Sequence, residues 1–298
     1  MARRLTVVAV TLVIWLAVGG VFLAVTGGVL SQGGDGGAGG SYFGPRVAVV
    51  ELEGIILDVD DILKELKSYR DNPQVRAVVI RINSPGGVVG PSQELHDALR
   101  RLRQGGKPVV ASLGAVAASG GYYVAVAADR IYANPGTLTG SIGVIMQMAN
   151  FEQLMKKVGV DYVVVKAGAF KDVGNPGRPM TPEERRVLQA VLDDVHAQFI
   201  GAVADGRKLE RSQVTQFADG RIFSGSQAKA LQMIDELGGL EDAVNGAAQL
   251  AGLRVPPKII SPRRRISIFD LVRSQLGITG ATLGPALPVF KTPLYLMD

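Results

Sequence analysis

Two residues of this chain have types and surroundings that could perform nucleophilic catalysis. Ser119 opens a run of small residues and tyrosines, SGGYY (119–123), and Lys171 follows 52 positions later within GAFKD (168–172). Because the chain has no cysteine and only two histidines, a Cys/His site is impossible and a Ser/His site has few candidates. A serine nucleophile with a lysine base is therefore the most economical interpretation. A serine that only caps a helix and a lysine that is only solvated are the ordinary alternatives.

Lys171 can take a proton from a serine hydroxyl only when its amine is neutral. The unperturbed lysine pKa is about 10.4, so burial against apolar groups would have to lower that pKa by roughly three units. Phe170 is compatible with such apolar surroundings, whereas the Asp172 carboxylate would oppose the lowering of the lysine pKa if it faced the amine. Ser141, in TGSIG (139–143), could orient the neutral amine by hydrogen bonding, and by itself it would be a turn serine.

Two glycine-containing segments could supply backbone N–H donors to the oxyanion that forms during acyl transfer. SPGG (84–87) follows an apolar β-branched run, and its glycine pair would let the backbone approach a ligand closely. Gly120 could supply a second N–H, and the start of the following helix would reinforce it. A plain Pro-Gly turn is the structural alternative for residues 84–87.

Apolar runs and amphipathic stretches alternate along the chain and predict an α/β fold with a mostly parallel sheet. We expect buried strands over 47–52, 77–82, 108–113 and 162–166, and helices over 58–70, 91–103 and 119–128. The helix that begins at Pro182 is the clearest, because Thr181 can cap it and Glu184 completes a capping box. His96 and His196 lie on two of these helices and are interpreted as ordinary surface or core residues.

Charge and hydropathy restrict where the protein can be located and which classes of molecule it can bind. The net charge of +5 is partly local, in Arg3, Arg4 and RRR (263–265), so nucleic-acid binding is poorly supported. Residues 5–30 carry no charge over 26 positions, which is long enough for a helix to span a bilayer. Because Arg3 and Arg4 precede the span, we expect a single-pass cell-membrane anchor with a cytoplasmic amino terminus and an extracytoplasmic catalytic domain. A cleaved signal peptide is the alternative.

The sequence therefore divides into four parts. Residues 1–30 form a stub and anchor, 31–45 a Gly/Ser-rich linker, 46–252 one catalytic domain, and 253–298 a tail that is first basic and then apolar. The tail lacks strong periodicity, and we expect it to pack against a neighbouring subunit or the membrane surface.

Five segments together resemble the signal peptide peptidase A family of membrane-anchored serine proteases, in its short, single-repeat form. They fall within about residues 46–250 and are SPGG (84–87), ASGGYY (118–123), GTLTGSIGV (136–144), AGAFKDVG (167–174) and DGRIFSGSQAKALQMID (219–235). The resemblance implies Ser119 as nucleophile and Lys171 as general base. It further implies Gly87 and Gly120 as oxyanion donors, and Ser141 as the residue that orients the lysine. The chemistry requires no metal or organic cofactor.

The resemblance also implies a fold similar to the ClpP and crotonase group, in which repeated ββα units spiral into one domain and subunits form a ring-like or dome-like homo-oligomer. The implied substrates are apolar peptides, chiefly the remnants of cleaved signal peptides, and membrane lipid is an expected partner. Three alternatives stay open: a related membrane protease that acts on a stomatin-like partner, a crotonase-type acyl-CoA enzyme, and an inactive scaffold.

Overall fold

The computed structural model describes residues 44–261 and 294–296. The expected anchor over residues 5–30 and most of the linker lie outside the described residues, as does most of the tail. Within the described part, no helix is both long enough and apolar enough to cross a membrane. The chain divides into two compact units, Met1–Gly44 and Pro45–Asp298, and all elements below belong to the second.

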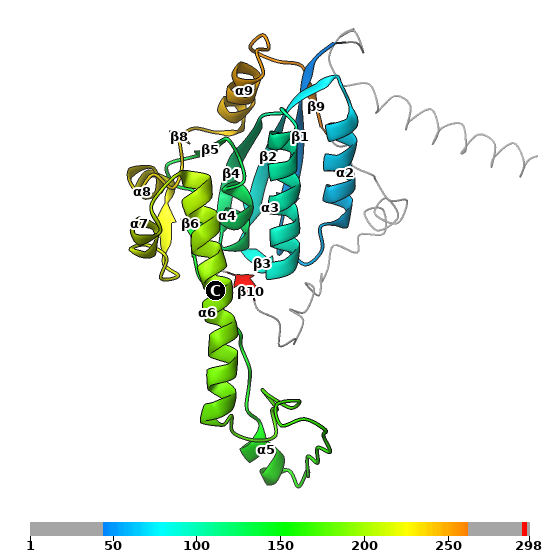
Figure 1. Ribbon diagram of the computed structural model, residues 1–298, viewed down its shortest axis with the longest axis vertical. Coiled ribbons are helices and arrows are strands. Elements are labelled where there is room, and N and C mark those ends of the chain that lie inside the picture. The colour runs from blue at the N-terminus through cyan, green and yellow to red at the C-terminus, as the bar shows by residue number, and fades with distance from the viewer. Residues whose placement is uncertain (1–43, 262–293, 297–298) are drawn as a thin grey trace, which may run out of the picture. The chain divides into compact units, whose positions relative to one another are not determined.

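A mostly parallel sheet forms the centre of this unit (Figure 1). The strand order is β7-β6-β4-β2-β1-β9, with β5 and β8 joined to the side of β4, and only the β6–β7 pair is antiparallel. The strands are β1 (Arg46–Glu53), β2 (Val75–Ser84), β4 (Val109–Ala118), β5 (Arg130–Ala133), β6 (Leu138–Gly140), β7 (Ile222–Ser224), β8 (Glu236–Leu237) and β9 (Ile259–Ile260). The expected α/β class with a mostly parallel sheet is confirmed.

Helices cover both faces of the sheet, as the alternation of side chains along the strands requires. In β1, Ala48 and Val50 face one core, shared with α2, α3, α4 and α6, whereas Val47 and Val49 face a second core under α9. The helices are α2 (Asp60–Asp71), α3 (Val89–Gln104), α4 (Gly120–Ala125), α5 (Glu152–Lys157), α6 (Pro182–Arg207), α7 (Arg211–Thr215), α8 (Gly225–Ala230) and α9 (Leu240–Leu250). The helices and the first three strands expected from the sequence are therefore present.

Helix α6 begins as its sequence predicts. Thr181 accepts a hydrogen bond from the Glu184 backbone N–H at 3.2 Å, and the Glu184 carboxylate accepts the Thr181 backbone N–H at 2.9 Å. This reciprocal capping box satisfies two donors that an open helix end would leave without partners. The carboxyl-terminal half of α6 packs into the core that it shares with α4, where the centroid of the Phe199 ring lies 5.1 Å from that of the Tyr123 ring.

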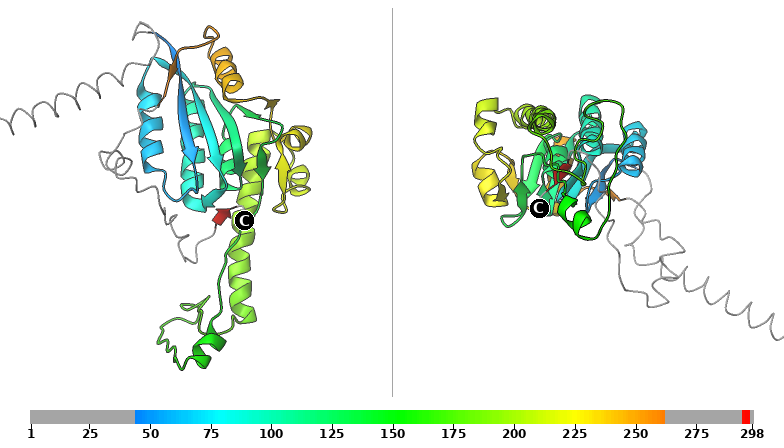
Figure 2. Two further views of the ribbon diagram at one scale, coloured as in Figure 1. Left: turned by 180° about the vertical axis from the view of Figure 1, so that it is seen from behind. Right: turned by 90° about the horizontal axis from the view of Figure 1, so that it is seen from below.

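Residues 143–195, which we call the arm, extend away from the sheet (Figures 1 and 2). The arm comprises α5, the loop that follows it, and the first half of α6. No residue from 143 to 172 is buried. The strand expected over 162–166 is wrong: these residues form no strand, and Val163 and Val165 are 81% and 97% exposed. An apolar run of this kind predicts burial, but none of the described residues covers it.

A second, two-stranded sheet joins distant parts of the chain. Strand β3 (Gly86–Val88) pairs in antiparallel fashion with β10 (Leu294–Leu296), so that Gly87 lies opposite Tyr295. Strand β10 also contacts α3 and α4. The end of the chain therefore lies beside the segment that the sequence predicts to be an oxyanion loop.

Candidate functional site

Ser119 occupies the sharp turn between β4 and α4. Its backbone φ and ψ angles are 52° and −120°, in a region that residues other than glycine rarely adopt. The side chain is fully buried, its hydroxyl has no hydrogen-bond partner, and it makes no capping bond to α4. The alternative that Ser119 is only a helix cap therefore has no support in the geometry, because the hydroxyl is left available.

Ser141 lies next to Ser119 because of the pairing between β4 and β6. Ala118 is opposite Gly140 in the two parallel strands, and the Ser119 backbone N–H donates to the Gly140 carbonyl oxygen at 2.8 Å. Ser141 also has a positive φ, 50°, is buried, and donates its backbone N–H to the Arg221 carbonyl oxygen at 2.8 Å. The structure thus brings together two of the predicted site residues that are separated by 22 positions in the sequence.

Gly87 lies at a close approach between two backbones. The residues on either side of Gly87 form hydrogen bonds to Ile56 along one edge of β3. The Gly86 carbonyl accepts the Ile56 N–H at 2.9 Å, and the Val88 N–H donates to the Ile56 carbonyl at 2.7 Å. Because strand residues alternate in direction, the N–H and C=O of Gly87 face the other side, where β10 pairs. A Cβ at position 87 would lie 2.1 Å from the Ile56 oxygen, so only glycine fits.

Helix α4 begins against the end of β2. A Cβ at Gly121 would lie 2.9 Å from the Ser84 carbonyl oxygen, so this glycine permits the contact. Ser84 is fully buried, and its hydroxyl accepts the Gly86 backbone N–H at 3.1 Å, which fixes the turn into β3. The segment at 84–87 is therefore more than a surface turn: it is folded against the first turn of α4, in which Gly120 follows Ser119.

Lys171 lies on the arm and is exposed. Its backbone N–H donates to the Gly168 carbonyl at 3.2 Å within a loop of short turns that ends before Thr181. Within the described residues, its amine forms no ion pair, and no hydrogen bond joins it to the Ser119 hydroxyl. The loop lies at the end of the arm, whereas α4 lies against the sheet (Figure 1). One chain therefore places Ser119, Ser141, Gly87 and Gly120 together and does not add Lys171 to them.

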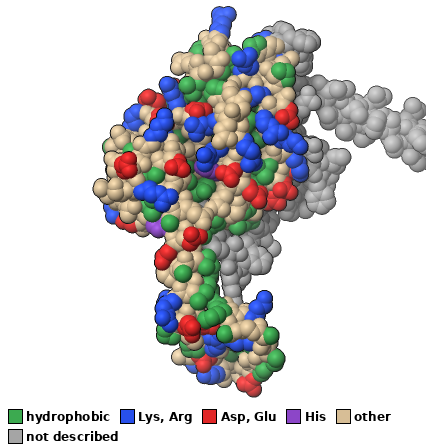
Figure 3. Space-filling model, viewed as in Figure 1, with side chains coloured by type: hydrophobic (Ala, Val, Ile, Leu, Met, Phe, Trp, Pro, Cys, Tyr) green, Lys and Arg blue, Asp and Glu red, His purple; other side chains and the backbone are tan. Residues whose placement is uncertain are grey.

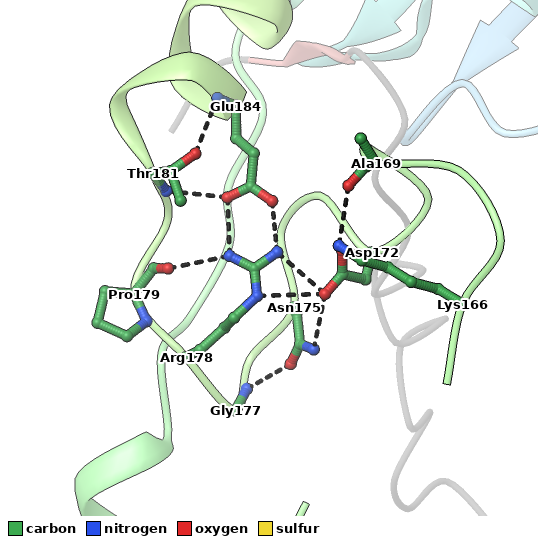
Figure 4. A network of polar contacts seen from close by, with 9 residues as sticks. All are labelled: Lys166, Ala169, Asp172, Asn175, Gly177, Arg178, Pro179, Thr181 and Glu184. Carbon is green, nitrogen blue, oxygen red and sulfur yellow. Dashed lines mark hydrogen bonds and ion pairs between the residues drawn. The ribbon is translucent and has the colours of Figure 1, made fainter. Parts of the chain in front are cut away.

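The loop that carries Lys171 contains a polar network that the sequence did not predict (Figure 4). The Asp172 carboxylate accepts hydrogen bonds from Lys166 and from Arg178 Nε, the latter at 3.1 Å. The Arg178 guanidinium also binds both oxygens of Glu184. The Lys166 and Arg178 cations hold the pKa of Asp172 well below its usual range, and Arg178 with the capping N–H lowers the pKa of Glu184 to about 2.

Neither histidine forms a hydrogen bond to the Ser119 hydroxyl. His96 is buried, its ring lies 4.9 Å from that of Tyr123, and burial lowers the pKa of its imidazole. His196 is partly buried on α6. Among the described residues, no cluster of three or more histidine or carboxylate side chains could hold a metal ion.

The surface of the arm carries large apolar side chains on α5, the following loop and α6 (Figure 3). These side chains are 41% to 97% exposed and include Phe151, Leu154, Val158, Val160, Tyr162, Val163, Val164, Val165, Phe170, Val187 and Val191. Exposed apolar surface of this extent is typical of a contact with another molecule.

Comparison with known proteins relates the chain to peptidases. The family model described as "Peptidase family S49" matches residues 101–254, which include Ser119, Ser141 and Lys171. "Putative protease slr0021" of Synechocystis sp. is 46% identical over 210 residues, which are 70% of this chain and 75% of that protein. "Protease 4" of Salmonella typhi is 36% identical over 71% of this chain, and "Serine protease SPPA, chloroplastic" of Arabidopsis thaliana is 32% identical over 69%. The aligned regions span 35% and 30% of these two longer relatives.

Proposed function

Because the chain belongs to peptidase family S49 and is thereby a protease, we propose that it is a serine endopeptidase with Ser119 as nucleophile and Lys171 as general base. One observation carries the first assignment. Ser119 holds a rare backbone conformation, and its buried hydroxyl has no partner, beside two glycine-rich segments that offer backbone N–H groups. Strain of this kind persists at sites where a reactive group must be presented in one direction.

The proposed chemistry proceeds through an acyl-enzyme. Ser119 Oγ attacks the peptide carbonyl while its proton passes to neutral Lys171. The resulting oxyanion accepts hydrogen bonds from the backbone N–H groups of Gly87 and Gly120. The protonated lysine returns the proton to the leaving amine, and water then hydrolyses the ester. The backbone of Ser141 lies beside that of the nucleophile, and its hydroxyl is proposed to hydrogen-bond the incoming amine. No metal or organic cofactor takes part in this scheme.

A second copy of the chain supplies the lysine in this proposal. Two features support it: the partial site at Ser119 does not include Lys171 of the same chain, and the arm that carries Lys171 has an apolar surface that no described residue covers. When a neighbouring copy covers that surface, the amine moves from water into an apolar contact, and such burial lowers a lysine pKa. The active oligomer would thereby supply the neutral base that the proposed mechanism requires.

We further propose that the enzyme is anchored in the cell membrane by residues 5–30 and cleaves apolar peptides such as signal-peptide remnants. The uncharged segment and the sequence resemblance support this substrate class, and a fold of the ClpP and crotonase group is proposed on the same resemblance. A relative from Enterococcus faecium, 36% identical over 61% of this chain, is named "Putative signal peptide peptidase SppA". The proposed topology has the catalytic unit outside the cytoplasm.

The test combines labelling with complementation. A serine-directed phosphonylating reagent should label the wild-type protein and not Ser119→Ala, whereas an inactive scaffold would show no labelling that depends on Ser119. Ser119→Ala and Lys171→Ala should each be inactive on an apolar peptide. When the two are unfolded, mixed and refolded together, roughly one quarter of the sites would combine an intact Ser119 with an intact Lys171 from different copies. No recovery in the mixture would contradict a shared site, and full activity of Lys171→Ala alone would remove the lysine from the mechanism.

A further inference from the structure

Lys171 and Asp172 are neighbours in the chain, which creates a problem for a lysine that has to be neutral. A carboxylate close to an amine favours the protonated amine and so raises its pKa. The effect is strongest when a site excludes water, because the effective dielectric constant falls. A working base at position 171 therefore needs the charge at position 172 to be turned away or compensated.

The structure provides both conditions. The Asp172 side chain is 11% exposed and is directed to Lys166 and Arg178, with a longer contact of 3.5 Å from the Asn175 amide (Figure 4). Arg178 Nη2 and Nε lie 3.0 and 3.1 Å from Asp172 Oδ2. Two cations thus face this carboxylate, and none of its ion pairs involves Lys171.

Arg178 also connects the loop to the start of α6. Its Nη1 donates to Glu184 Oε2 at 2.8 Å, and its Nη2 donates to the other oxygen of the same carboxylate. Glu184 is 3% exposed and simultaneously accepts the Thr181 backbone N–H as part of the capping box. One planar guanidinium therefore binds the residue after Lys171 on one edge and the first turn of α6 on another, a geometry that lysine cannot reproduce.

We propose that Arg178 is a positioning residue for the general base: it holds Asp172 away from Lys171 and fixes the loop 168–175 on the amino terminus of α6. This inference rests on the proposed role of Lys171. The charged groups that face Asp172 are Lys166 and Arg178, and the group that faces Arg178 from α6 is Glu184. On α5, the other helix of the arm, Glu152 is paired with Lys156.

The pH profile of kcat/KM on an apolar peptide tests the proposal with the full chain. In Arg178→Gln, Asp172 loses one of its two cations, so the rise of activity with pH should move to higher pH. A shift of about one pH unit lowers kcat/KM roughly tenfold on the acidic side of the profile. The double variant Asp172→Asn/Arg178→Gln removes the carboxylate as well and should return the rise to its wild-type position. Arg186→Gln, which changes an exposed arginine on α6, the helix that Arg178 contacts through Glu184, is the matched control and should leave the profile in place.

Two further variants separate this idea from a purely structural role and from the proposed function. Arg178→Lys keeps a charge beside Asp172 but cannot bind Glu184 through two nitrogens, so it should lower kcat/KM without moving the profile. Suppose that Lys171→Ala is inactive, but folded Arg178→Gln shows no shift to higher pH or the double variant does not return to the wild-type position. The positioning role of Arg178 would then be wrong, and the proposed function would stand. If Arg178→Gln failed to fold, the Arg178→Lys profile would decide, because a shift there would overturn the charge argument. If Lys171→Ala kept its activity, the proposed function itself would fail.

Discussion

Ser119 and Gly140 are joined by a backbone hydrogen bond of 2.8 Å, which continues the β4–β6 pairing one residue past the end of β4. This bond pairs the backbone N–H of the candidate nucleophile with β6, although Ser119 itself lies after the end of β4. The residue after Gly140 is Ser141, so the same bond places the two serines side by side. Both serines have positive φ angles, 52° for Ser119 and 50° for Ser141.

The Ser119 hydroxyl should contribute nothing favourable to stability. It is buried without a hydrogen-bond partner, so Ser119→Ala should abolish peptidase activity and leave the free energy of unfolding unchanged or higher. Ser112 is a matched control, because it is equally buried but its hydroxyl accepts a hydrogen bond from Arg81 at 2.8 Å. Ser112→Ala should lower the free energy of unfolding by about 1 kcal/mol. Chemical denaturation of the two variants measures the contrast, and equal destabilisation would contradict the unpartnered state of Ser119.

Gly87 and Gly90 should respond in opposite ways to alanine. A Cβ at Gly87 would collide with the Ile56 carbonyl oxygen, so Gly87→Ala should displace β3 and cost about 2 kcal/mol or more. Gly90 lies in α3, and a Cβ there meets no atom within 4 Å. Gly90→Ala should therefore be neutral or stabilising by up to about 1 kcal/mol. Denaturation midpoints of the two variants decide the matter, and a tolerated Gly87→Ala would show that β3 is not held as closely as described.

Glu184 should make the protein more stable above about pH 4.5 than below it. Its folded-state pKa is lowered to about 2 by Arg178 and the capping N–H, and a depressed carboxyl pKa contributes stability that is present above the unfolded-state pKa. That contribution is lost as the pH falls from about 4.5 towards 2. Asp172 acts in the same direction.

The variant Glu184→Gln isolates this charge, because glutamine can still complete the capping box. At pH 5 its melting temperature should lie below that of the wild type, and the difference should narrow as the pH falls to 3. A constant difference across this range would mean that the Arg178–Glu184 pair does not supply the pH dependence.

Strand β10 should compete with extended peptides. It pairs with β3 on the side to which the Gly87 N–H and C=O are directed, and added strands are a common way to bind peptide backbones. Removal of residues 294–298 should therefore lower KM for an apolar peptide several-fold, with little change in kcat. Removal of residues 297–298 alone, which leaves β10 intact, is the control. Identical KM values for both truncations and the full chain would show that β10 does not occupy the peptide position.

Sequence patterns were sufficient where a local rule determines the structure. The capping box at Thr181 and Glu184 and the buried runs of β1, β2 and β4 depend on neighbouring residues, and they are present as expected. The run at 162–166 has the same β-branched character as a buried strand, but its apolar side chains lie on the arm, where none of the described residues covers them. Periodicity reports the tendency to be buried and not which molecule provides the burial.

The candidate site, too, could be predicted from the sequence only in part. The resemblance pointed to Ser119, Ser141 and Gly87, but their proximity results from the β4–β6 register and the β2–β3 turn, which residue spacing does not encode. The spacing from Ser119 to Lys171 contains no information on whether the two belong to one copy. Arg178 was missed because nothing local distinguishes it from other arginines, and its role depends on two carboxylates brought together by the loop.

Helix α6 runs without interruption from the arm to the core that packs beside Ser119. Its 26 residues extend about 39 Å at 1.5 Å per residue, and a sharp kink in such a helix would interrupt its backbone hydrogen bonds. Phe199 near its far end packs on Tyr123, whose backbone N–H donates to the Ser119 carbonyl oxygen at 2.8 Å. A rigid helix of this kind couples the arm to the turn at Ser119. If a neighbouring copy tilted the arm on docking, the tilt would also move Phe199 against Tyr123, and docking would thereby change the orientation of the Ser119 hydroxyl.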